Sequence, residues 1–252
     1  MRRFPLRRPL SVLIIDMEFH DNCAGPNGWT GYTPDPHTFA PPYGFNDSMQ
    51  ELGTMGLQVG LNLHDADGVY PCEEKYTALK EALDLGPTWT GPIPFNATDR
   101  RYMLALQDVV VQRLVGGGAA VQWTDWQQGG STGVDIPGWS PTYLLNYVRS
   151  STAVRLGEDR RSWSLARYGG LGQQRDGTMG FSGDYLRGWD SLRFLPYFSS
   201  TATNAYWQWS HDATGGIPGA LEFNVRWVQA ATVSAMFRTH GSGIPLPGGW
   251  DW

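Results

Sequence analysis

Ionisable side chains recur at the ends of short apolar stretches along this chain. The residues at these ends are Asp16, His64, Asp125, Arg167, Asp184, His211, Asp212 and His240. Any one of them is explained by exposure at the rim of a fold. If all seven stretches are parallel strands around one axis, however, their carboxyl ends meet and predict a convergent polar site. Carboxylates and imidazoles gathered in this way are the groups of acid–base and nucleophilic chemistry.

One of these stretches has an unusually aromatic setting. The segment QWTDWQQG, residues 122–129, places Asp125 between Trp123 and Trp126, and the chain contains 12 Trp, 11 Tyr and 10 Phe. An indole is difficult to bury completely because its N–H needs a partner, so surplus tryptophan often lines ligand pockets. Sugar rings present flat apolar faces that suit such a pocket. An aromatic core would account for the same composition, so composition alone leaves both interpretations open.

The stretches that carry these residues alternate with helical patterns. Candidate strands lie at 11–16, 57–64, 120–125, 163–167, 179–184, 205–212 and 234–240. Helices are expected at 73–85, 98–114, 142–156, 185–198 and 220–232, with Thr98 as the N-cap of the second. This alternation predicts a parallel sheet. A closed (β/α) barrel is favoured over an open doubly wound sheet because no Gly-rich dinucleotide fingerprint follows the first strand.

Length, charge and cysteine content restrict the class of protein. The 252 residues are 41% hydrophobic and 17% charged, which is ample for the core of one domain. A net charge of -5 argues against nucleic acid and anionic lipid as partners. The first apolar run is too short for a signal peptide or a membrane span, so we expect a soluble protein, with its compartment open. Cys23 and Cys72 match neither a metal-ligand spacing nor a disulfide framework.

Many separate motifs of the chain resemble those of glycoside hydrolase family 31, in the same order. The motifs are DMEFH, GWTGYT, GLQVGLNLH, QWTDWQQG, ARYGGLG, GFSGD, WSHD, VRWVQ and FRTH. The resemblance extends over about residues 11–241. It implies a (β/α)8 TIM barrel with retaining α-glycosidase activity, a carbohydrate substrate, and neither a cofactor nor a metal.

The same resemblance assigns two catalytic carboxyl groups. The family motif W-x-D places the nucleophile at Asp125, and the motif W-[ST]-G-D places the acid/base at Asp184. Retaining glycosidases hold these groups about 5 to 5.5 Å apart, so the two carboxyls should face each other at the carboxyl ends of the strands. Trp123 and Trp126 would then exclude water and shape the sugar pocket.

Further positions resemble sugar-binding residues of the family. Asp16 resembles the residue that binds distal hydroxyls of the first-subsite sugar, and Arg167 the arginine that balances the acidic site. Asp212 matches the seventh-strand aspartate and His240 the hydroxyl-binding histidine. The other substrate-binding candidates are Trp123, Trp126, Phe181 and His211, with His64 and Glu18 as weaker ones. Each could instead be a strand-end group that the backbone satisfies.

Departures from the family pattern leave the substrate and the completeness of the barrel open. Phe181 stands where many members have Trp, Trp126 and Gln127 replace Met-Asn, and HDATGG is one residue longer than usual. We therefore expect only an α-glucosidase-like activity on terminal α-linked sugars. The family's first strand, N-terminal β-sandwich and C-terminal β-domains have no counterpart here. We expect residues 1–252 to form a single, incomplete barrel domain whose open edge favours self-association.

Two other classes of function remain as alternatives. A metal-dependent hydrolase is suggested by HDADG at 64–68, although no H-x-H or H-E-x-x-H motif supplies ligands at standard spacing. A sugar-binding protein without catalysis would keep the aromatic pocket but lack a working barrel. Sensitivity to a chelator would identify the first, and sugar binding without turnover the second.

Overall fold

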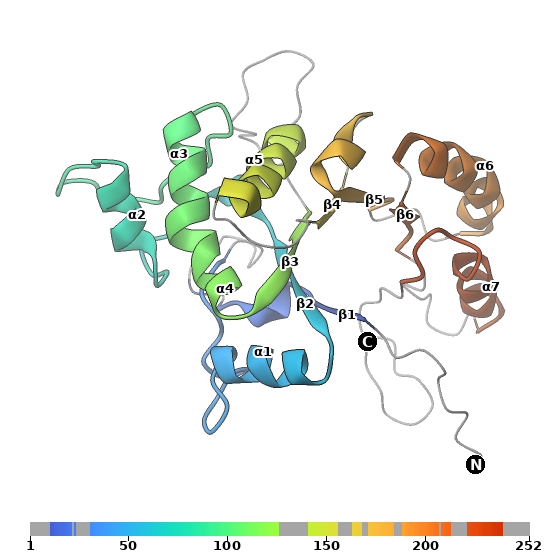
Figure 1. Cartoon of the computed structure of the whole chain (residues 1–252), viewed down its shortest axis with the longest axis horizontal. Helices are drawn as coiled ribbons and strands as arrows, with labels where there is room; N and C mark the ends of the chain where they lie inside the picture. Colours follow the sequence, from blue (N-terminus) through green and yellow to red (C-terminus); the bar gives the residue numbers. More distant parts are fainter. Residues whose placement is uncertain are drawn as a thin grey trace. The chain divides into compact units, whose positions relative to one another are not determined.

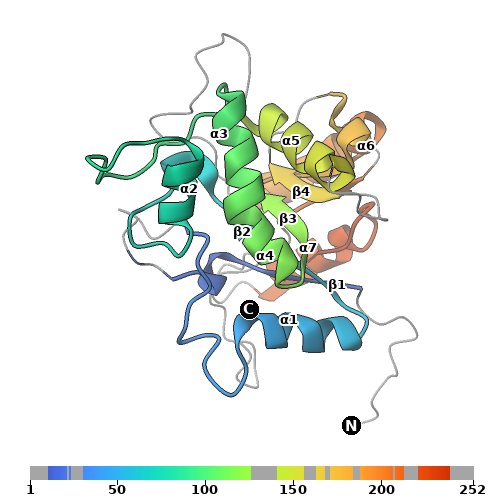
Figure 2. The ribbon, with the colours of Figure 1, turned by 60° about the vertical axis from the view of Figure 1, so that its left-hand side comes forward.

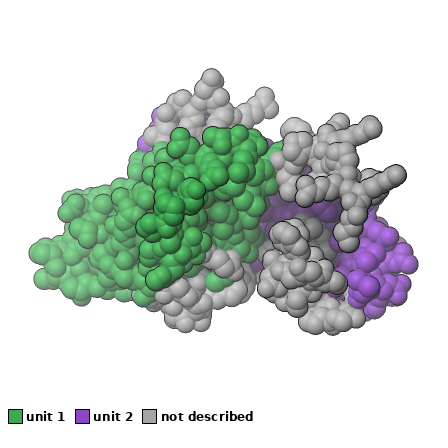
Figure 3. All heavy atoms as spheres, turned by 90° about the horizontal axis from the view of Figure 1, so that it is seen from below, with its two compact units in different colours: residues 1–152 green, residues 153–252 purple. Residues whose placement is uncertain are grey.

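The computed structural model consists of two compact units, residues 1–152 and residues 153–252, which Figure 3 colours separately. It describes residues 11–21, 23, 31–125, 141–155, 163–167, 171–183, 188–206, 208–212 and 221–238. Each unit contains three parallel strands that pair in chain order, with helices between them. None of the helices in this part of the chain has the length and apolar character that a bilayer crossing requires.

The sheet of the first unit comprises β1 (Val12–Ile15), β2 (Gln58–Leu63) and β3 (Ala119–Thr124). Parallel neighbours need crossover connections, and helices supply them. The helices are α1 (Phe45–Thr54), α2 (Tyr76–Ala82), α3 (Arg100–Ala105), a π-helical stretch (Leu106–Val111), α4 (Gln112–Gly116) and, after β3, α5 (Pro141–Arg155). Figure 1 and Figure 2 show α3 and α4 as one continuous rod beside β2 and β3.

The two faces of this sheet have different chemistry because side chains alternate along a strand. One face carries Val59, Leu61 and Leu63, which join the hydrophobic core with residues of the helices. Each such buried side chain contributes roughly 1.5–3 kcal/mol to folding. The other face carries Asn62 and Trp123, which are partners in the parallel register. Asn62 therefore lies on the face away from this core.

Two details of the helices differ from the sequence prediction. Asp99, and not Thr98, caps α3, because its carboxylate accepts the backbone N–H groups of Arg101 at 2.8 Å and Tyr102 at 3.3 Å. The Thr98 hydroxyl instead donates to Asn96 Oδ1 at 2.9 Å. Helix α1 was not expected at all. Its apolar face is narrow, since Phe45 and Met49 are its only buried residues.

The second unit pairs β4 (Ser164–Arg167), β5 (Thr178–Phe181) and β6 (Trp209–Ser210), and its helices are α6 (Trp189–Tyr206) and α7 (Leu221–Ala231). The strand expected at 205–212 is shorter because its first residues belong to α6. The strand expected at 234–240 is absent from its described part, 234–238. The Met236 N–H nevertheless donates to the Trp209 carbonyl at 3.1 Å, so this segment lies beside β6.

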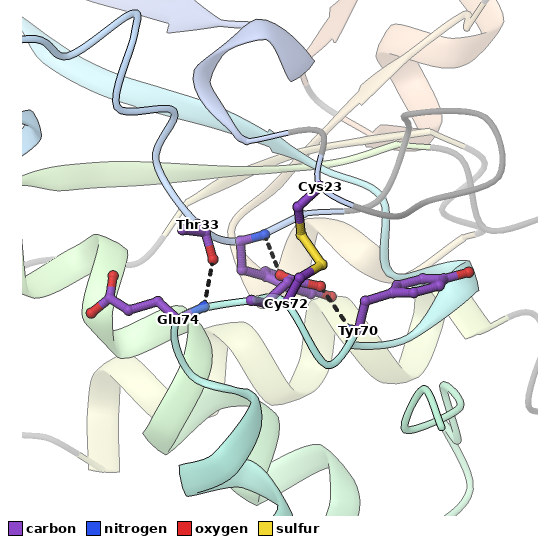
Figure 4. Close-up of a disulfide and its surroundings, with 7 residues drawn as sticks. Cys23, Thr33, Tyr70, Cys72 and Glu74 are labelled. Carbon is purple, nitrogen blue, oxygen red and sulfur yellow. Dashed lines mark hydrogen bonds between the residues drawn. A yellow bond between two sulfur atoms is a disulfide. The ribbon is translucent and has the colours of Figure 1, made fainter. Parts of the chain in front are cut away.

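A disulfide joins Cys23 to Cys72, and the expectation of no disulfide framework was wrong. The two cysteines lie 49 residues apart in the sequence, a spacing that follows no recognised pattern. They meet because β1 and β2 are adjacent and parallel, so the segments after them leave the same edge of the sheet. Figure 4 shows a second link beside it, in which the Glu74 N–H donates to Thr33 Oγ1 at 2.8 Å.

Candidate active site

Asp125 lies at the carboxyl end of β3, where it is buried with 6% of its surface exposed. Asn62 Nδ2 donates to its Oδ2 at 3.3 Å, and His64 Nε2 lies 3.5 Å from the same oxygen. Both neighbours come from β2 or the residue directly after it. The amide donor of Asn62 stabilises the negative charge of this oxygen and fixes its orientation.

Asn62 also connects Asp125 to a second predicted residue, Asp16. Its Nδ2 donates to Asp16 Oδ1 at 2.6 Å, and the same oxygen accepts the Met17 N–H at 2.8 Å. A single buried amide therefore bridges carboxylates that follow β1 and β3. Sequence reasoning missed Asn62. The available signal was a polar residue in the middle of the otherwise apolar stretch LQVGLNL.

Trp123 lies on β3, two residues before Asp125, and is 2% exposed. The alternation of side chains places it on the same face of the sheet as Asp125. Its role in substrate binding stays a prediction.

In the second unit, Arg167 and Phe181 end the neighbouring strands β4 and β5 and are partners in the register. Both are buried, and the guanidinium carbon of Arg167 lies 5.5 Å from the centre of the Phe181 ring, a cation–π distance. Gly183 packs against this guanidinium, because a Cβ there would lie 2.9 Å from Arg167 Nε. Its φ of 66° also favours glycine, which explains the second glycine of GFSGD.

Asp212 follows β6 and forms a buried ion pair with Arg238. The Asp212 N–H also donates to Ser182 Oγ at 3.2 Å, and the guanidinium carbon of Arg238 lies 5.0 Å from the centre of the Phe181 ring. Backbone groups alone therefore do not satisfy Asp212. Arg238 was not among the predicted residues, although it belongs to the motif FRTH.

His211 contacts helix α6 and the aromatic side chains around β6. Its Nε2 lies 2.7 Å from the Ser199 hydroxyl, and its ring centre lies 6.1 Å from that of Trp209 and 6.3 Å from that of Trp227. Burial, with a smaller contribution from the positive charge of Arg238, lowers the pKa of His211 to about 4. The imidazole is therefore neutral at pH 7, and its role in substrate binding stays a prediction.

Three predicted residues, Asp184, Trp126 and His240, lie outside the described residues, as does the side chain of Glu18. The expected separation of the Asp125 and Asp184 carboxyl groups therefore stays a prediction. In the described part of the chain, no three His, Cys, Asp or Glu side chains gather as they would around a metal ion.

Residues 6–246 match the family model of the glycosyl hydrolases family 31 TIM-barrel domain. The chain belongs to glycosyl hydrolase family 31. The family and the barrel fold that the motifs predicted are thereby confirmed, and the six parallel strands are part of that barrel domain.

Three proteins that are similar to this chain are named as xylosidases. An α-xylosidase of Saccharolobus solfataricus is 26% identical over 263 residues, which cover 94% of this chain and 34% of that protein. The family 31 α-xylosidase of Xanthomonas citri superimposes with a TM-score of 0.70 at 19% identity, covering 92% of this chain and 29% of that one. A xylosidase of Aspergillus niger gives 0.67 at 20% identity, with coverages of 93% and 39%.

These matches differ in what they show. The chain spans about a third of the length of the curated relative. The two solved structures are below 25% identity and show the fold alone.

Proposed function

We propose that the chain supplies the catalytic barrel of a retaining α-glycosidase that hydrolyses terminal α-linked sugars, with Asp125 as the nucleophile. The observation that carries the proposal is the position of Asp125 in its W-x-D motif at the end of β3, where it is buried, accepts a hydrogen bond from Asn62 at Oδ2 and has His64 Nε2 3.5 Å from the same oxygen. Family membership supports it. The acid/base of the proposal is Asp184, by its place in the motif GFSGD.

In this mechanism the carboxylate of Asp125 attacks the anomeric carbon while Asp184 gives its proton to the leaving oxygen. The bond to the aglycone breaks, and a glycosyl ester on Asp125 results. Asp184, now a carboxylate, then takes a proton from water, which attacks the same carbon and releases Asp125. Two inversions return the α-anomer. Asn62 would keep the attacking carboxylate oriented through both steps.

We propose two alternative substrates, an α-glucoside and an α-xyloside. The resemblance favours an α-glucosidase-like enzyme, whereas the names of the relatives in Saccharolobus and Xanthomonas favour an α-xyloside. The two sugars differ by the hydroxymethyl group on C5. A pocket that contacts the hydroxymethyl group distinguishes the two sugars in two ways. It can form a hydrogen bond with the hydroxyl of this group, and it can match the volume of the group.

A panel of 4-nitrophenyl α-glycosides of glucose, xylose, galactose and N-acetylgalactosamine distinguishes these two substrates. The panel should be applied to the 252-residue chain and to a longer version with flanking segments. We expect turnover of the glucoside or the xyloside, with the α-anomer as the first product in proton NMR. A β-anomer would indicate inversion, sugar binding without turnover a binding protein, and loss of turnover with a chelator a metal-dependent hydrolase.

We also propose self-association through β1. Within the described residues β1 pairs with β2 alone, and Leu13 on it is 38% exposed. An unpaired strand edge is a site of association between chains. Sedimentation of the chain at increasing concentration should show an oligomer, and a monomer at all concentrations would contradict this proposal.

A further inference from the structure

A buried polar network lies on the other face of the first unit's sheet from Asp125. We call Tyr32, Asp65, Thr124 and Arg149 the Asp65 network. Arg149 donates through one terminal nitrogen to Asp65 Oδ2 at 2.6 Å and through the other to Thr124 Oγ1. The Tyr32 hydroxyl donates to Asp65 Oδ1 at 2.5 Å. Asp65 is completely buried, and the side chain of Arg149 is 1% exposed.

Two members of the network are sequence neighbours of residues in the candidate site. Thr124 is the last residue of β3 and directly precedes Asp125, and Asp65 directly follows His64. Successive side chains of a strand point to opposite faces, so Thr124 meets α5 while Asp125 meets Asn62. The guanidinium of Arg149 therefore ties the end of β3 to the segment after β2.

The energetics of the network favour a role in geometry over a role in stability. A fully buried ion pair loses about as much in desolvation as it gains, and apolar residues of similar volume are often as stable. Its retention is explained when the pair fixes a particular arrangement. The two oxygens of Asp65 have separate donors, and burial together with the charge of Asp65 raises the pKa of Tyr32 well above its ordinary value. The tyrosine hydroxyl thus stays a donor.

We propose that Arg149 and Thr124 are positioning residues for the nucleophile. Arg149, oriented by Asp65, holds the Thr124 hydroxyl and thereby sets the direction in which the next residue, Asp125, presents its carboxylate. The inference rests on the proposed function of Asp125. A displacement of the reacting atom by about 1 Å can cost roughly 10²-fold in rate, so a contact on the opposite face of the sheet is sufficient to affect the reaction.

The test compares Thr124→Val, which removes the hydroxyl but keeps the branched shape, with Thr124→Ser, which keeps the hydroxyl. The readout is the rate at which 5-fluoro-α-D-glucosyl fluoride, or its xylosyl counterpart, labels Asp125, measured by intact mass and peptide mapping. Inhibition by the free sugar reports ground-state binding. We expect labelling of Thr124→Val to slow by about 10- to 100-fold while the inhibition constant changes less than about threefold. Thr124→Ser should retain most of the rate.

Two further variants distinguish a loss of positioning from a folding defect. Arg149→Lys keeps a positive charge beside Asp65 but cannot donate to both partners in a fixed fork, so it should slow labelling as Thr124→Val does. Thr54→Val removes an exposed hydroxyl at the end of α1 and should label at the wild-type rate. Melting temperatures by circular dichroism show which variants fold.

Two results would overturn the inference. The first is a folded Thr124→Val and a folded Arg149→Lys that label at the wild-type rate. The second is an equal loss in Thr124→Val and Thr124→Ser accompanied by weaker sugar binding, which would indicate packing alone. A folded wild-type chain that is not labelled on Asp125 would refute the proposed function itself, and the inference with it, and is distinguishable because it concerns the wild type.

Discussion

The carboxylates at the strand ends of the two units have different partners. In the first unit, an amide and an imidazole contact Asp125, while the arginine of that region, Arg149, pairs with Asp65 on the other face of the sheet. In the second unit, Asp212 pairs directly with the guanidinium of Arg238. A guanidinium partner neutralises a carboxylate and weakens it as a nucleophile, whereas an amide orients it and leaves its charge. The comparison favours Asp125 for attack and Asp212 for organisation of its surroundings.

Removing each carboxylate tests this comparison most directly. Asp125→Asn should lower kcat by roughly 10⁴-fold or more, because no other group replaces the nucleophile. Asp212→Asn should lower kcat/KM by only about 10- to 100-fold, the scale of one lost hydrogen bond to a charged group. It should also lower the melting temperature, because Arg238 loses its buried partner. Equal effects of the two substitutions on turnover would contradict the difference in roles.

Reduction of the disulfide should destabilise the first unit selectively. Both cysteines of the chain lie in that unit, and the bond closes a loop with a sequence separation of 49 residues. Replacing both cysteines by serine should lower the free energy of unfolding by about 2–4 kcal/mol. Hydrogen exchange should rise in α1, α2 and β2 and change little in α6 and α7. A uniform rise in both units would show that they unfold together.

Mild acid should destabilise the second unit through His211. The pKa of His211 is about 4 in the folded chain, against about 6.5 when unfolded, so the unfolded state binds a proton first as pH falls. The stabilisation from the neutral imidazole is complete above pH 6.5 and is lost between about 6.5 and 4, at most about 3 kcal/mol. His211→Asn should remove this dependence from exchange rates in α6 and β6. An unaltered pH dependence would assign it to other groups.

A smaller effect on turnover is expected when a substitution introduces a third carboxylate next to Asp16 and Asp125. Asn62→Asp replaces the donor between Asp16 and Asp125 by a group of like charge. Turnover should fall about tenfold near neutral pH, and the acid limb of the rate profile should move to higher pH, because repulsion disfavours ionisation. Asn46→Asp on α1, where the side chain contacts Arg113, is the matched control and should leave the profile in place. An unshifted limb in Asn62→Asp would place Asn62 outside the reaction.

Much of the fold could be predicted from local patterns. The six strands and α2 through α7 overlap the stretches that apolar periodicity and end signals predicted, because those signals report which side chains must be buried. The bounds differ most at α6, which was expected at 185–198 and spans Trp189–Tyr206, and at β6, which is only Trp209–Ser210. The exceptions are informative. Helix α1 buries only two residues and therefore leaves a weak pattern, and the run 234–238 contacts β6 through a backbone hydrogen bond from Met236 without forming a strand in its described residues. Asp99 caps α3 in place of Thr98 because its carboxylate accepts the first free N–H groups of the helix, whereas the Thr98 hydroxyl donates to Asn96.

The candidate site, like the fold, has features that the sequence predicts and features that it does not. The sequence by itself determined the family and the placing of Asp16, Asp125, Arg167 and Asp212 at strand ends, because motif order and strand periodicity are properties of neighbouring residues. Only the tertiary structure decided their partners. Asn62 reaches Asp16 across 46 residues and Arg149 reaches Asp65 across 84, and these contacts exist because parallel register and helix packing bring distant segments together. No local pattern encodes that distance.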